Sequence, residues 1–363
     1  MPFEVVQVVN SACRRRGGAE NLVVDLHSAL ARRQISSRLL SLEAYHARSG
    51  DGPIVSLGYA TPYDPRALFQ LATTIRKQCA TANILHAHLF PTSLYIAFLS
   101  SVGIVRQPCI FTEHSTNNRR RNSWWLRLLD RWIYGRFARI VAISDGVRDA
   151  LLNAHPQLKD KISIVRNGIA LNSEMPGRSA GRDTVRLVSA GRLKDVKNYP
   201  AALKAVSSLT ARDIEYSILG DGPMRPELET LIEKLELAER VKLAGHVGDV
   251  RARLEAADIF LMPSKWEGFG LAAVEAMNAG LPLVVSDVPG LREVVGEDGE
   301  CAFLVDPEQP GEIAAALRRL IENPELRSAM GRRAFERSLG FGQDAMVDGY
   351  IDVYRSVAGA QHG

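Results

Sequence analysis

The residues best suited to chemistry are two glutamates, Glu267 and Glu275, which lie on either side of a glycine-rich turn. An apolar run at 258–262 precedes them and is typical of a buried strand. Residues 271–277 are strong helix formers, and Gly280 is a suitable C-terminal stop. The sequence therefore predicts a strand, a glycine loop, and a helix that begins at the strand's carboxyl edge.

Such a helix start is an anion site, because its first amides have no partner within the helix and the helix dipole favours negative charge there. Gly268 and Gly270 let a phosphate approach the backbone. Glu267 in the loop and Glu275 just over one turn into the helix both point toward a ligand at this position. Carboxylates accept hydrogen bonds from sugar hydroxyls. The pattern predicts a nucleotide-sugar site, although an ordinary strand–turn–helix with two exposed glutamates also fits.

Two cations follow another predicted strand at 185–190, namely Arg192 and Lys197. A guanidinium fork and an ammonium point charge both suit phosphate oxygens, and they neutralise charge on a leaving diphosphate. No carboxylate pair of the D-x-D type stands at a strand end. We therefore expect no metal and no cofactor, with the nucleotide sugar acting as a substrate.

Length and charge indicate two domains with different partners. A chain of 363 residues predicts two domains of about 150–200 residues each. Up to Gly168 there are 22 Lys and Arg against 11 Asp and Glu, and from Ile169 onward 23 against 30. The basic first half favours an anionic membrane surface or a phosphate-bearing acceptor. No recognised nucleic-acid motif is present, so nucleic acid is not an expected partner.

Targeting signals and cysteine usage favour a cytoplasmic protein. No apolar run reaches the roughly 18 residues of a membrane span, and no basic region opens the sequence, so no signal peptide is predicted. The four cysteines are scattered without metal-ligand spacing, which is typical of reduced thiols.

Strands alternate with helices in both halves, which predicts parallel sheets covered by helices, with ligands beyond the strands' carboxyl ends. The loop after the first strand carries Gly17 and Gly18 instead of G-x-G-x-x-G, which disfavours a dinucleotide enzyme. The predicted strands are 5–9, 35–40, 54–57, 84–88, 109–114, 139–143, 185–190, 216–219, 241–244, 258–262, 282–286 and 302–305. The main predicted helices are 21–33, 65–79, 91–101, 311–322, 324–338 and 343–357.

Three histidines lie at strand ends in the first half. His114 follows one strand, and this position favours a role in a ligand cleft over a purely structural role. His88 ends the preceding strand and is a candidate for the same cleft. We expect His86 and His88 to project to opposite faces of their strand and therefore not to share a metal.

A basic and aromatic segment at 118–133 is the candidate for contact with a membrane or acceptor. It begins with Arg119, Arg120 and Arg121, which we expect to face the membrane or an acceptor phosphate. The stripe that follows has helical spacing, and we expect it to pack on the sheet, although a helix with Trp and Arg also fits an anionic bilayer. The stripe residues are Trp125, Leu128, Leu129, Trp132 and Ile133.

The segment EGFGLAAVEAMNAGLPLVVSD, with Glu267 and Glu275 in an E-x7-E pattern, resembles the signature of the family 4 glycosyltransferases. The GGAE, VRNGI and GRL…K segments are similar to that family as well, so the resemblance covers nearly the whole chain. It implies the GT-B fold, an α/β architecture of two Rossmann-like βαβ domains facing a cleft. It also implies an acceptor-binding domain at 1–170 that includes a final helix at 343–363, and a donor-binding domain at 171–342.

The resemblance also implies roles for individual residues. His114 contacts the donor sugar near its reacting carbon, Glu275 the ribose, and Glu267 the sugar and β-phosphate. Arg192 and Lys197 hold the diphosphate. The remaining implied donor contacts are Gly17, Gly18, His246, Val247, Gly268, Phe269, Gly270 and Leu271.

The resemblance implies a retaining glycosyltransferase that uses a UDP- or GDP-linked sugar. Retention in this family is described as front-face attack, and Glu267 is the minority candidate for a nucleophile. We expect the acceptor to be a lipid-linked saccharide of polysaccharide or lipopolysaccharide biosynthesis, reached from the inner face of the cell membrane. Three alternatives stay open: a synthase with a soluble sugar or sugar-phosphate acceptor, a nucleotide-sugar epimerase, and a non-catalytic sugar-binding partner.

Overall fold

The structure is a computed structural model that describes residues 4–13, 17–45, 53–118, 120, 123–177, 184–209 and 214–359. The chain divides into two compact units. Unit 1 comprises Met1–Asn167 and Asp344–Gly363, and unit 2 comprises Gly168–Gln343. These bounds differ by a few residues from the division expected from the sequence.

The described part of unit 1 forms a seven-stranded parallel sheet in the order β3-β2-β1-β4-β5-β6-β7. Its central strands β1, β4 and β5 are buried at nearly every position, as expected for a sheet covered on both faces. The strands are β1 (Glu4–Val9), β2 (Ser36–Glu43), β3 (Ile54–Tyr59), β4 (Ile84–His88), β5 (Cys109–Glu113), β6 (Arg139–Ala142) and β7 (Ile162–Ile164).

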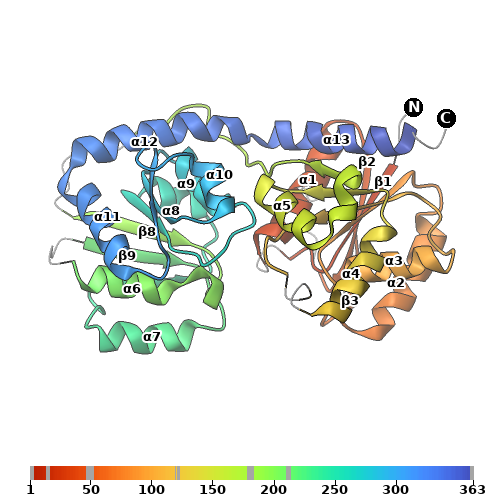
Figure 1. Ribbon diagram of the computed structural model, residues 1–363, viewed down its shortest axis with the longest axis horizontal. Coiled ribbons are helices and arrows are strands. Elements are labelled where there is room, and N and C mark those ends of the chain that lie inside the picture. Colours follow the sequence, from red (N-terminus) through yellow and green to blue (C-terminus); the bar gives the residue numbers. More distant parts are fainter. Residues whose placement is uncertain are drawn as a thin grey trace. The chain divides into compact units, whose positions relative to one another are not determined.

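Helices cover both faces of this sheet (Figure 1). The final helix, α13, lies beside α1, because Arg33 at the end of α1 pairs with Asp344 at 2.9 Å and with Asp348 at 3.0 Å. Helices α2, α3 and α4 cover the opposite face. The helical segments are α1 (Gly18–Arg32), α2 (Pro65–Gln78), α3 (Thr92–Ser101), α4 (Trp124–Gly135), α5 (Asp145–Ala154), η2 (Pro156–Lys161) and α13 (Gln343–Gly359).

The described part of unit 2 forms a six-stranded parallel sheet in the order β10-β9-β8-β11-β12-β13. Helices α6, α7 and α11 pack together, and α9 packs against α8, α10 and α12. The strands are β8 (Val185–Ala190), β9 (Ile214–Leu219), β10 (Val241–Gly245), β11 (Ile259–Met262), β12 (Leu283–Ser286) and β13 (Ala302–Val305). The helical segments are η3 (Asp195–Lys197), α6 (Tyr199–Ser207), α7 (Arg225–Lys234), α8 (Val250–Glu255), α9 (Leu271–Asn278), α10 (Pro289–Val295), α11 (Pro310–Glu322), α12 (Pro324–Ser338) and η4 (Leu339–Phe341).

Each sheet has one point at which the strand order reverses. In unit 1 the point lies between β1 and β4, and in unit 2 it lies between β8 and β11. Loops that leave the strand ends at such a point diverge, which opens a crevice where open parallel sheets bind their ligands. The loops after β1, β8 and β11, together with the helices that they lead into, carry most of the donor contacts predicted from the sequence.

The prediction that the apolar stripe of α4 packs on the sheet is wrong. Trp125 is 57% exposed and Leu128 is 55% exposed, whereas Ile133 is buried. The inward face of α4 also holds Asp130, whose carboxylate receives the Arg120 guanidinium at 2.5 Å. The Arg120–Asp130 ion pair therefore occupies part of the inward face of α4, where the spacing pattern predicts apolar side chains.

Residues 171–183 contain one proline and two glycines, a composition that predicts a linker, and the start of this segment is anchored to unit 2. The Asn172 amide donates to Asn278 Oδ1 at 2.7 Å, and Asn172 is 6% exposed. Residues 178–183 lie outside the described residues. Across the described ranges, no helix combines the length and the apolar character that a membrane span requires.

Candidate active site

The glycine-rich turn after β11 leads into α9 as the sequence predicts. Gly270 precedes the helix with φ at 100°, a left-handed conformation that favours glycine. A Cβ at this position would lie 2.6 Å from Leu291 Cδ2, so the Leu291 side chain would have to move to make room for it. The Ala273 amide donates to the Gly270 carbonyl at 2.8 Å, whereas helix geometry gives the Leu271 and Ala272 amides no acceptor within α9. The turn therefore has the backbone geometry of a helix start at which an anion can bind.

An ion pair joins the loop after β11 to the loop after β8. Lys197 Nζ donates to Glu267 Oε1, and the two side chains are 19% and 15% exposed. Ser264, which is buried, donates its hydroxyl to the same carboxylate oxygen at 3.0 Å. The cation predicted for phosphate and the carboxylate predicted for the sugar are therefore in direct contact at the reversal point of the sheet.

A second pair reinforces the junction of these two loops. Lys265 Nζ lies 2.6 Å from Asp195 Oδ1, and the Lys265 amide donates to the Val196 carbonyl at 2.8 Å. Sequence reasoning missed Ser264, Lys265 and Asp195. In the sequence these three residues were marked only by lying next to predicted site residues. Their contacts arise because β8 and β11 are neighbours in the sheet, which the sequence does not show.

The other predicted donor contacts of unit 2 surround the same edge. Arg192 and His246 are exposed, and Val247 is half-buried. Glu275 projects to solvent from α9, whereas the neighbouring Val274 is buried in the core. Arg192 and Glu275 are thus accessible to a ligand at the helix start, as their predicted roles require.

A glycine follows or ends each of β8, β9 and β10, and these glycines bring the three strand ends together. A Cβ on Gly220 would lie 2.1 Å from the Gly191 carbonyl oxygen, and the Gly220 amide donates to the Gly245 carbonyl at 2.8 Å. All three have positive φ angles, from 70° at Gly245 to 155° at Gly191. Backbone thus packs on backbone along this edge, which places the loop bearing His246 beside the loop bearing Arg192. Repetition of glycine after successive strands was the sequence signal for this arrangement.

In unit 1, Asn10 ties the two loops at the reversal point. Its Nδ2 donates to the Phe90 carbonyl at 2.8 Å, and its Oδ1 accepts from Thr92 Oγ1 at 2.5 Å. Gly17 precedes α1 and Gly18 opens it, so the predicted glycines lie at a second helix start beyond β1. Sequence reasoning assigned no role to Asn10, whose signal was its place at the end of β1.

Three histidines form a cluster near the carboxyl ends of β4 and β5, in which His86 and His88 are buried and His114 is half-buried. His86 contacts the Tyr354 hydroxyl at 2.8 Å and Thr112 Oγ1 at 2.7 Å. His88 Nδ1 lies 3.4 Å from His114 Nε2, and the His86 and His88 rings are 3.9 Å apart. The prediction that His86 and His88 face away from each other is wrong, because side chains two residues apart on a strand project to the same face.

Burial keeps these imidazoles neutral. It lowers the pKa of His86 to about 3 and that of His114 to about 4, and it lowers the pKa of His88 well below its ordinary value of 6.5. Among the described residues, His88 Nε2 and His114 Nδ1 are buried without a hydrogen-bond partner. The cluster therefore contains two neutral imidazole nitrogens whose hydrogen-bonding capacity the described residues leave unused.

The depressed pKa values predict acid sensitivity of folding. In the unfolded chain a histidine becomes protonated below about pH 6.5, whereas the His114 imidazole of the folded protein becomes protonated only below about pH 4. The free energy of unfolding should therefore fall on acidification across this window, by about 1.4 kcal/mol per pH unit for each such histidine. Urea unfolding at pH 7 and pH 5 measures this, and His114→Gln should flatten the dependence. His246→Gln, at an exposed position, should keep the wild-type slope, and equal slopes for all three proteins would contradict the prediction.

The structure describes one of the three arginines before α4, Arg120, and its contacts differ from those expected. Arg119 and Arg121 lie outside the described residues. Arg120 is 17% exposed, pairs with Asp130 at 2.5 Å, and lies 4.2 Å above the Phe90 ring. Its guanidinium is used inside unit 1, so its geometry does not support the expected contact with a membrane or an acceptor.

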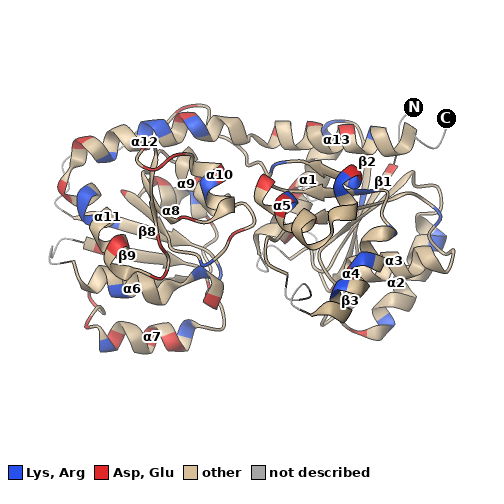
Figure 2. Ribbon diagram, in the orientation of Figure 1, with Lys and Arg blue, Asp and Glu red and all other residues tan. Residues whose placement is uncertain are grey.

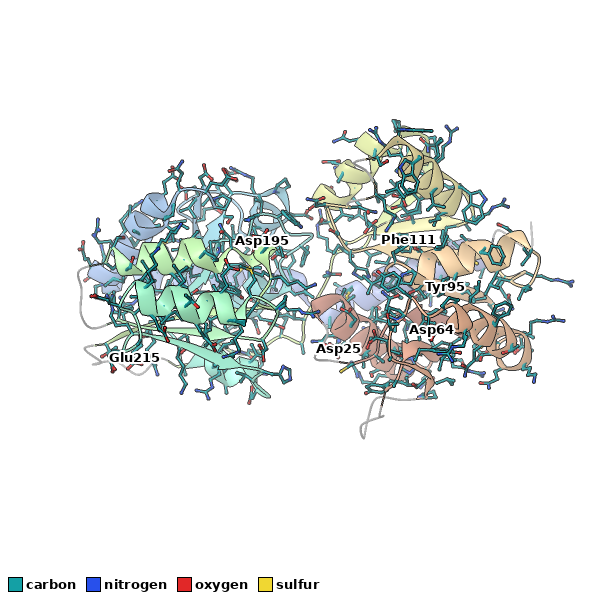
Figure 3. All side chains as sticks on the ribbon, turned by 90° about the horizontal axis from the view of Figure 1, so that it is seen from below. Asp25, Asp64, Tyr95, Phe111, Asp195 and Glu215 are labelled. Carbon is teal, nitrogen blue, oxygen red and sulfur yellow. The ribbon has the colours of Figure 1, made fainter. Side chains whose placement is uncertain are left out.

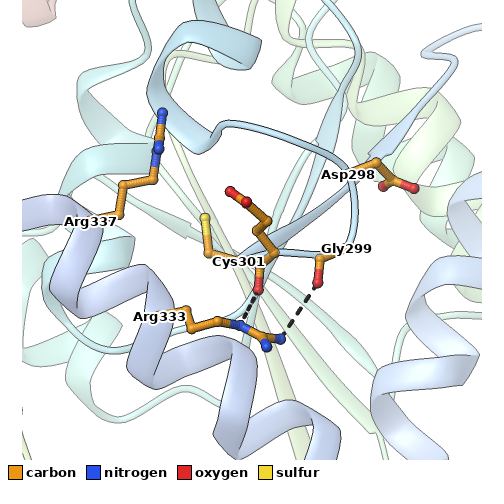
Figure 4. Close-up of a pocket in the computed structure, with 6 residues that line it drawn as sticks. Asp298, Gly299, Cys301, Arg333 and Arg337 are labelled. Atoms are coloured by element: carbon orange, nitrogen blue, oxygen red, sulfur yellow. Dashed lines mark hydrogen bonds between the residues drawn. The ribbon is translucent and has the colours of Figure 1, made fainter.

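One cavity in unit 2 lies away from these strand ends, between α12 and the loop before β13 (Figure 4). Arg333 Nε donates to the Glu300 carbonyl at 2.6 Å, and Arg337 Nε donates to the Val294 carbonyl at 2.6 Å. Burial raises the pKa of the Cys301 thiol to about 11, so the thiol stays protonated. These bonds hold α12 against the loop and against α10, and they indicate a structural cavity. In the described parts of the chain, no group of three or more His, Cys, Asp or Glu side chains is arranged to hold a metal.

Comparisons with known proteins agree with the geometry. The family model described as glycosyl transferases group 1 matches residues 178–337, and the model described as Glycosyltransferase Family 4 matches residues 16–173. A D-inositol 3-phosphate glycosyltransferase of Kineococcus radiotolerans is 32% identical over 60% of this chain and 57% of its own length. An alpha-D-kanosaminyltransferase of Streptomyces kanamyceticus is 31% identical over 52% of this chain and 50% of its own length. The chain thus matches little more than half the length of these relatives.

Solved structures share the fold at low sequence identity. The Anabaena protein Alr3699/HepE in complex with UDP and glucose has a TM-score of 0.85 at 19% identity, covering 98% of this chain and 100% of that one. A sucrose-phosphate synthase from Thermosynechococcus elongatus has a TM-score of 0.84 at 18% identity, again covering 98% and 100%. WaaG, a glycosyltransferase involved in lipopolysaccharide biosynthesis, has a TM-score of 0.76 at 14% identity, covering 96% and 99%.

The predicted resemblance and the predicted architecture of two parallel-sheet α/β domains are confirmed by these matches. Because the two family models together match most of the chain, from residue 16 to residue 337, the protein belongs to the family 4 glycosyltransferases of the group 1 type, with the GT-B fold.

Proposed function

We propose that this protein transfers a sugar from a nucleoside-diphosphate sugar to an acceptor, with retention of the anomeric configuration. The observation that carries the proposal is the contact between Lys197 and Glu267 at the reversal point of unit 2, beside the start of α9. It combines a cation for a diphosphate, a carboxylate for sugar hydroxyls and the first amides of α9 in one place.

In the proposed step, negative charge develops on the leaving diphosphate beside Lys197 and the start of α9. The bond between the anomeric carbon and the β-phosphate oxygen breaks, and the acceptor hydroxyl oxygen bonds to the same face of that carbon. The proton of the hydroxyl passes to the leaving phosphate oxygen. Arg192, Lys197 and the first amides of α9 stabilise the negative charge that develops on the diphosphate. In this proposal the cations take the place of a metal, and no cofactor takes part.

Unit 2 is proposed to bind the donor, with Glu275 on the ribose and with His246 and Val247 near the base. The donor is a UDP- or GDP-linked sugar, and the UDP complex of a protein with the same fold supports this class. Unit 1 is proposed to bind the acceptor, and His114 keeps the donor-sugar role that the resemblance gives it. Gly17 and Gly18, at the start of α1, belong to the same proposal.

The proposed acceptor is a lipid-linked saccharide of cell-surface polysaccharide or lipopolysaccharide biosynthesis, reached from the cytoplasmic face of the membrane. The net positive charge of the first half of the sequence supports this acceptor. A relative is named D-inositol 3-phosphate glycosyltransferase. A test of the acceptor should therefore also include a small phosphorylated acceptor.

A thermal-shift screen against UDP-, GDP- and ADP-sugars, followed by turnover with the stabilising donor, tests the proposal. A donor at a hundred times its Kd should stabilise the fold by about 2.7 kcal/mol. The sugar should then move to a lipid-extractable product with unchanged anomeric configuration, as read by NMR. Transfer only to D-inositol 3-phosphate would refute the lipid acceptor alone. An inverted product, donor epimerisation without acceptor, or no stabilisation by any donor would refute the proposed reaction.

A further inference from the structure

The end of β5 carries a buried carboxylate that the proposed reaction does not use. Glu113 is the last residue of β5 and is 7% exposed. Its Oε1 accepts hydrogen bonds from the His114 amide at 3.1 Å and from the Ser115 amide at 3.3 Å. Its Oε2 accepts from the Tyr134 hydroxyl at 3.0 Å. Burial of a carboxylate is unfavourable unless hydrogen bonds compensate for the lost water, so these donors explain why the position tolerates the charge.

The bonds from Glu113 fix the main chain where it leaves the sheet. The first two amides beyond β5 are both held by the side chain of the residue that precedes them. The first of these residues is His114, whose Nε2 lies 3.4 Å from His88 Nδ1 at the end of β4. The carboxylate therefore sets the path of the backbone at His114, and that path decides where the imidazole lies.

Tyr134 connects this carboxylate to the core side of α4. Its side chain is fully buried, and its ring stacks on that of Phe111, labelled in Figure 3, with 5.8 Å between the ring centroids. It also meets the His155 ring edge-on at 5.3 Å. These contacts leave the Tyr134 ring little freedom to move, so its hydroxyl is a fixed donor for Glu113.

Arg120 attaches the same stretch of chain to α4 a second time, through its ion pair with Asp130. Burial lowers the pKa of Arg120, but the hydrogen bond and charge of Asp130, together with the nearby charge of Glu113, raise it more. Glu113 is therefore within electrostatic reach of this guanidinium. The chain beyond β5 is held to α4 at Glu113 and again at Arg120.

We propose that Glu113 is a positioning residue for sugar transfer, which holds the main chain at His114 so that the imidazole meets the donor sugar, with Tyr134 fixing the carboxylate. The inference rests on the proposed function, because His114 has its donor-sugar role from there. A carboxylate suits the task, since its two oxygens accept hydrogen bonds from several donors at once. The sequence gave no sign of this role, because Tyr134 is distant from Glu113 in the chain.

Steady-state kinetics test the proposal first. Glu113→Ala should lower kcat about a hundredfold, the usual loss when a reacting geometry shifts by about 1 Å. The KM for the donor should be nearly unchanged, because unit 2 is proposed to bind the nucleotide. Glu113→Gln should recover most of the lost kcat, since glutamine keeps an oxygen for the two amides and an NH2 group that can donate to Tyr134. A glutamine variant as slow as the alanine variant would assign the effect to the charge itself and overturn the proposal.

A double-mutant cycle shows whether Glu113 acts through His114. In a His114→Ala background, Glu113→Ala should lower kcat no further, because both changes remove the same contribution. Losses that add would overturn the proposal. Arg131→Ala is the control, because Arg131 is exposed on α4, whose basic ribbon segments Figure 2 shows. This variant should keep the wild-type kcat, and circular dichroism should show every variant folded.

NMR of protein with isotope-labelled histidine, without donor or acceptor, gives a readout that needs no activity. The His114 signal is identified by its loss in His114→Gln. Glu113→Ala and Tyr134→Phe should shift this signal, whereas Arg131→Ala should not. Tyr134→Phe keeps the charge and removes one donor, so it carries the test if Glu113→Ala does not fold. An unshifted signal in the folded variants would overturn the proposal. A shifted signal in a protein without transferase activity would refute the proposed function and leave the coupling of Glu113 to His114 standing.

Discussion

Replacing Lys197 by alanine is expected to lower kcat about a hundredfold or more, the usual cost of losing one group that stabilises charge in the transition state. Lys197 follows the reversal-point strand β8 and pairs with Glu267 across the two loops. In the proposed step its ammonium neutralises the leaving diphosphate. The variant also leaves the Glu267 carboxylate without its cation, so repulsion of the donor phosphates should raise KM.

Lys204→Ala is the matched control, because Lys204 is an exposed lysine on α6, the helix that follows Lys197. Its kcat and KM should stay within about twofold of wild type, since exposed surface substitutions have small effects. Steady-state kinetics with the donor identified by the thermal-shift screen measure both variants. A Lys197→Ala enzyme with wild-type kcat would remove this cation from the reaction.

Replacing Glu275 by alanine is expected to weaken nucleotide binding about 10- to 100-fold, because a hydrogen bond to a charged group contributes about 1.5–3 kcal/mol. Glu275 is exposed on α9, and its neighbours Ala273 and Val274 anchor that helix in the core. The substitution should weaken only the contact with the ribose and leave the contacts with the diphosphate unchanged. Isothermal titration should therefore show weaker binding of UDP or GDP and unchanged binding of inorganic pyrophosphate.

Glu233→Ala, at an exposed site on α7, provides the charge-matched control and should bind both ligands as the wild type does. Parallel losses of nucleotide and pyrophosphate affinity in Glu275→Ala would mean that the helix start itself is damaged. Unchanged nucleotide affinity would show that the ribose lies elsewhere.

The strand, turn and helix around Gly270 could be predicted because every signal for them is local. An apolar run, two glycines and a series of helix formers are contiguous in the sequence, and the structure places the helix start at Leu271. The final helix could be assigned to unit 1 only through the family resemblance. Its contacts, such as Arg33 with Asp344, join distant parts of the chain.

Contacts across the sheet could not be predicted. Lys197 meets Glu267 because β8 lies beside β11, although β9 and β10 separate these strands in the sequence. The same limit explains the error at α4. The spacing of residues identifies an apolar stripe, but whether the stripe is buried depends on the side chains that pack against it. In this protein the Arg120–Asp130 ion pair occupies part of the inward face of α4. The error at His86 and His88 was one of strand geometry.

A crystal structure with bound UDP or GDP tests most directly the claim that a diphosphate binds at the start of α9. Phosphate oxygens should lie within hydrogen-bonding distance of the Gly270 and Leu271 amides, and beside the Arg192 guanidinium and the Lys197 ammonium. The ribose hydroxyls should contact the Glu275 carboxylate. A nucleotide bound away from these groups, at any other part of either unit, would show that the start of α9 is not the diphosphate site.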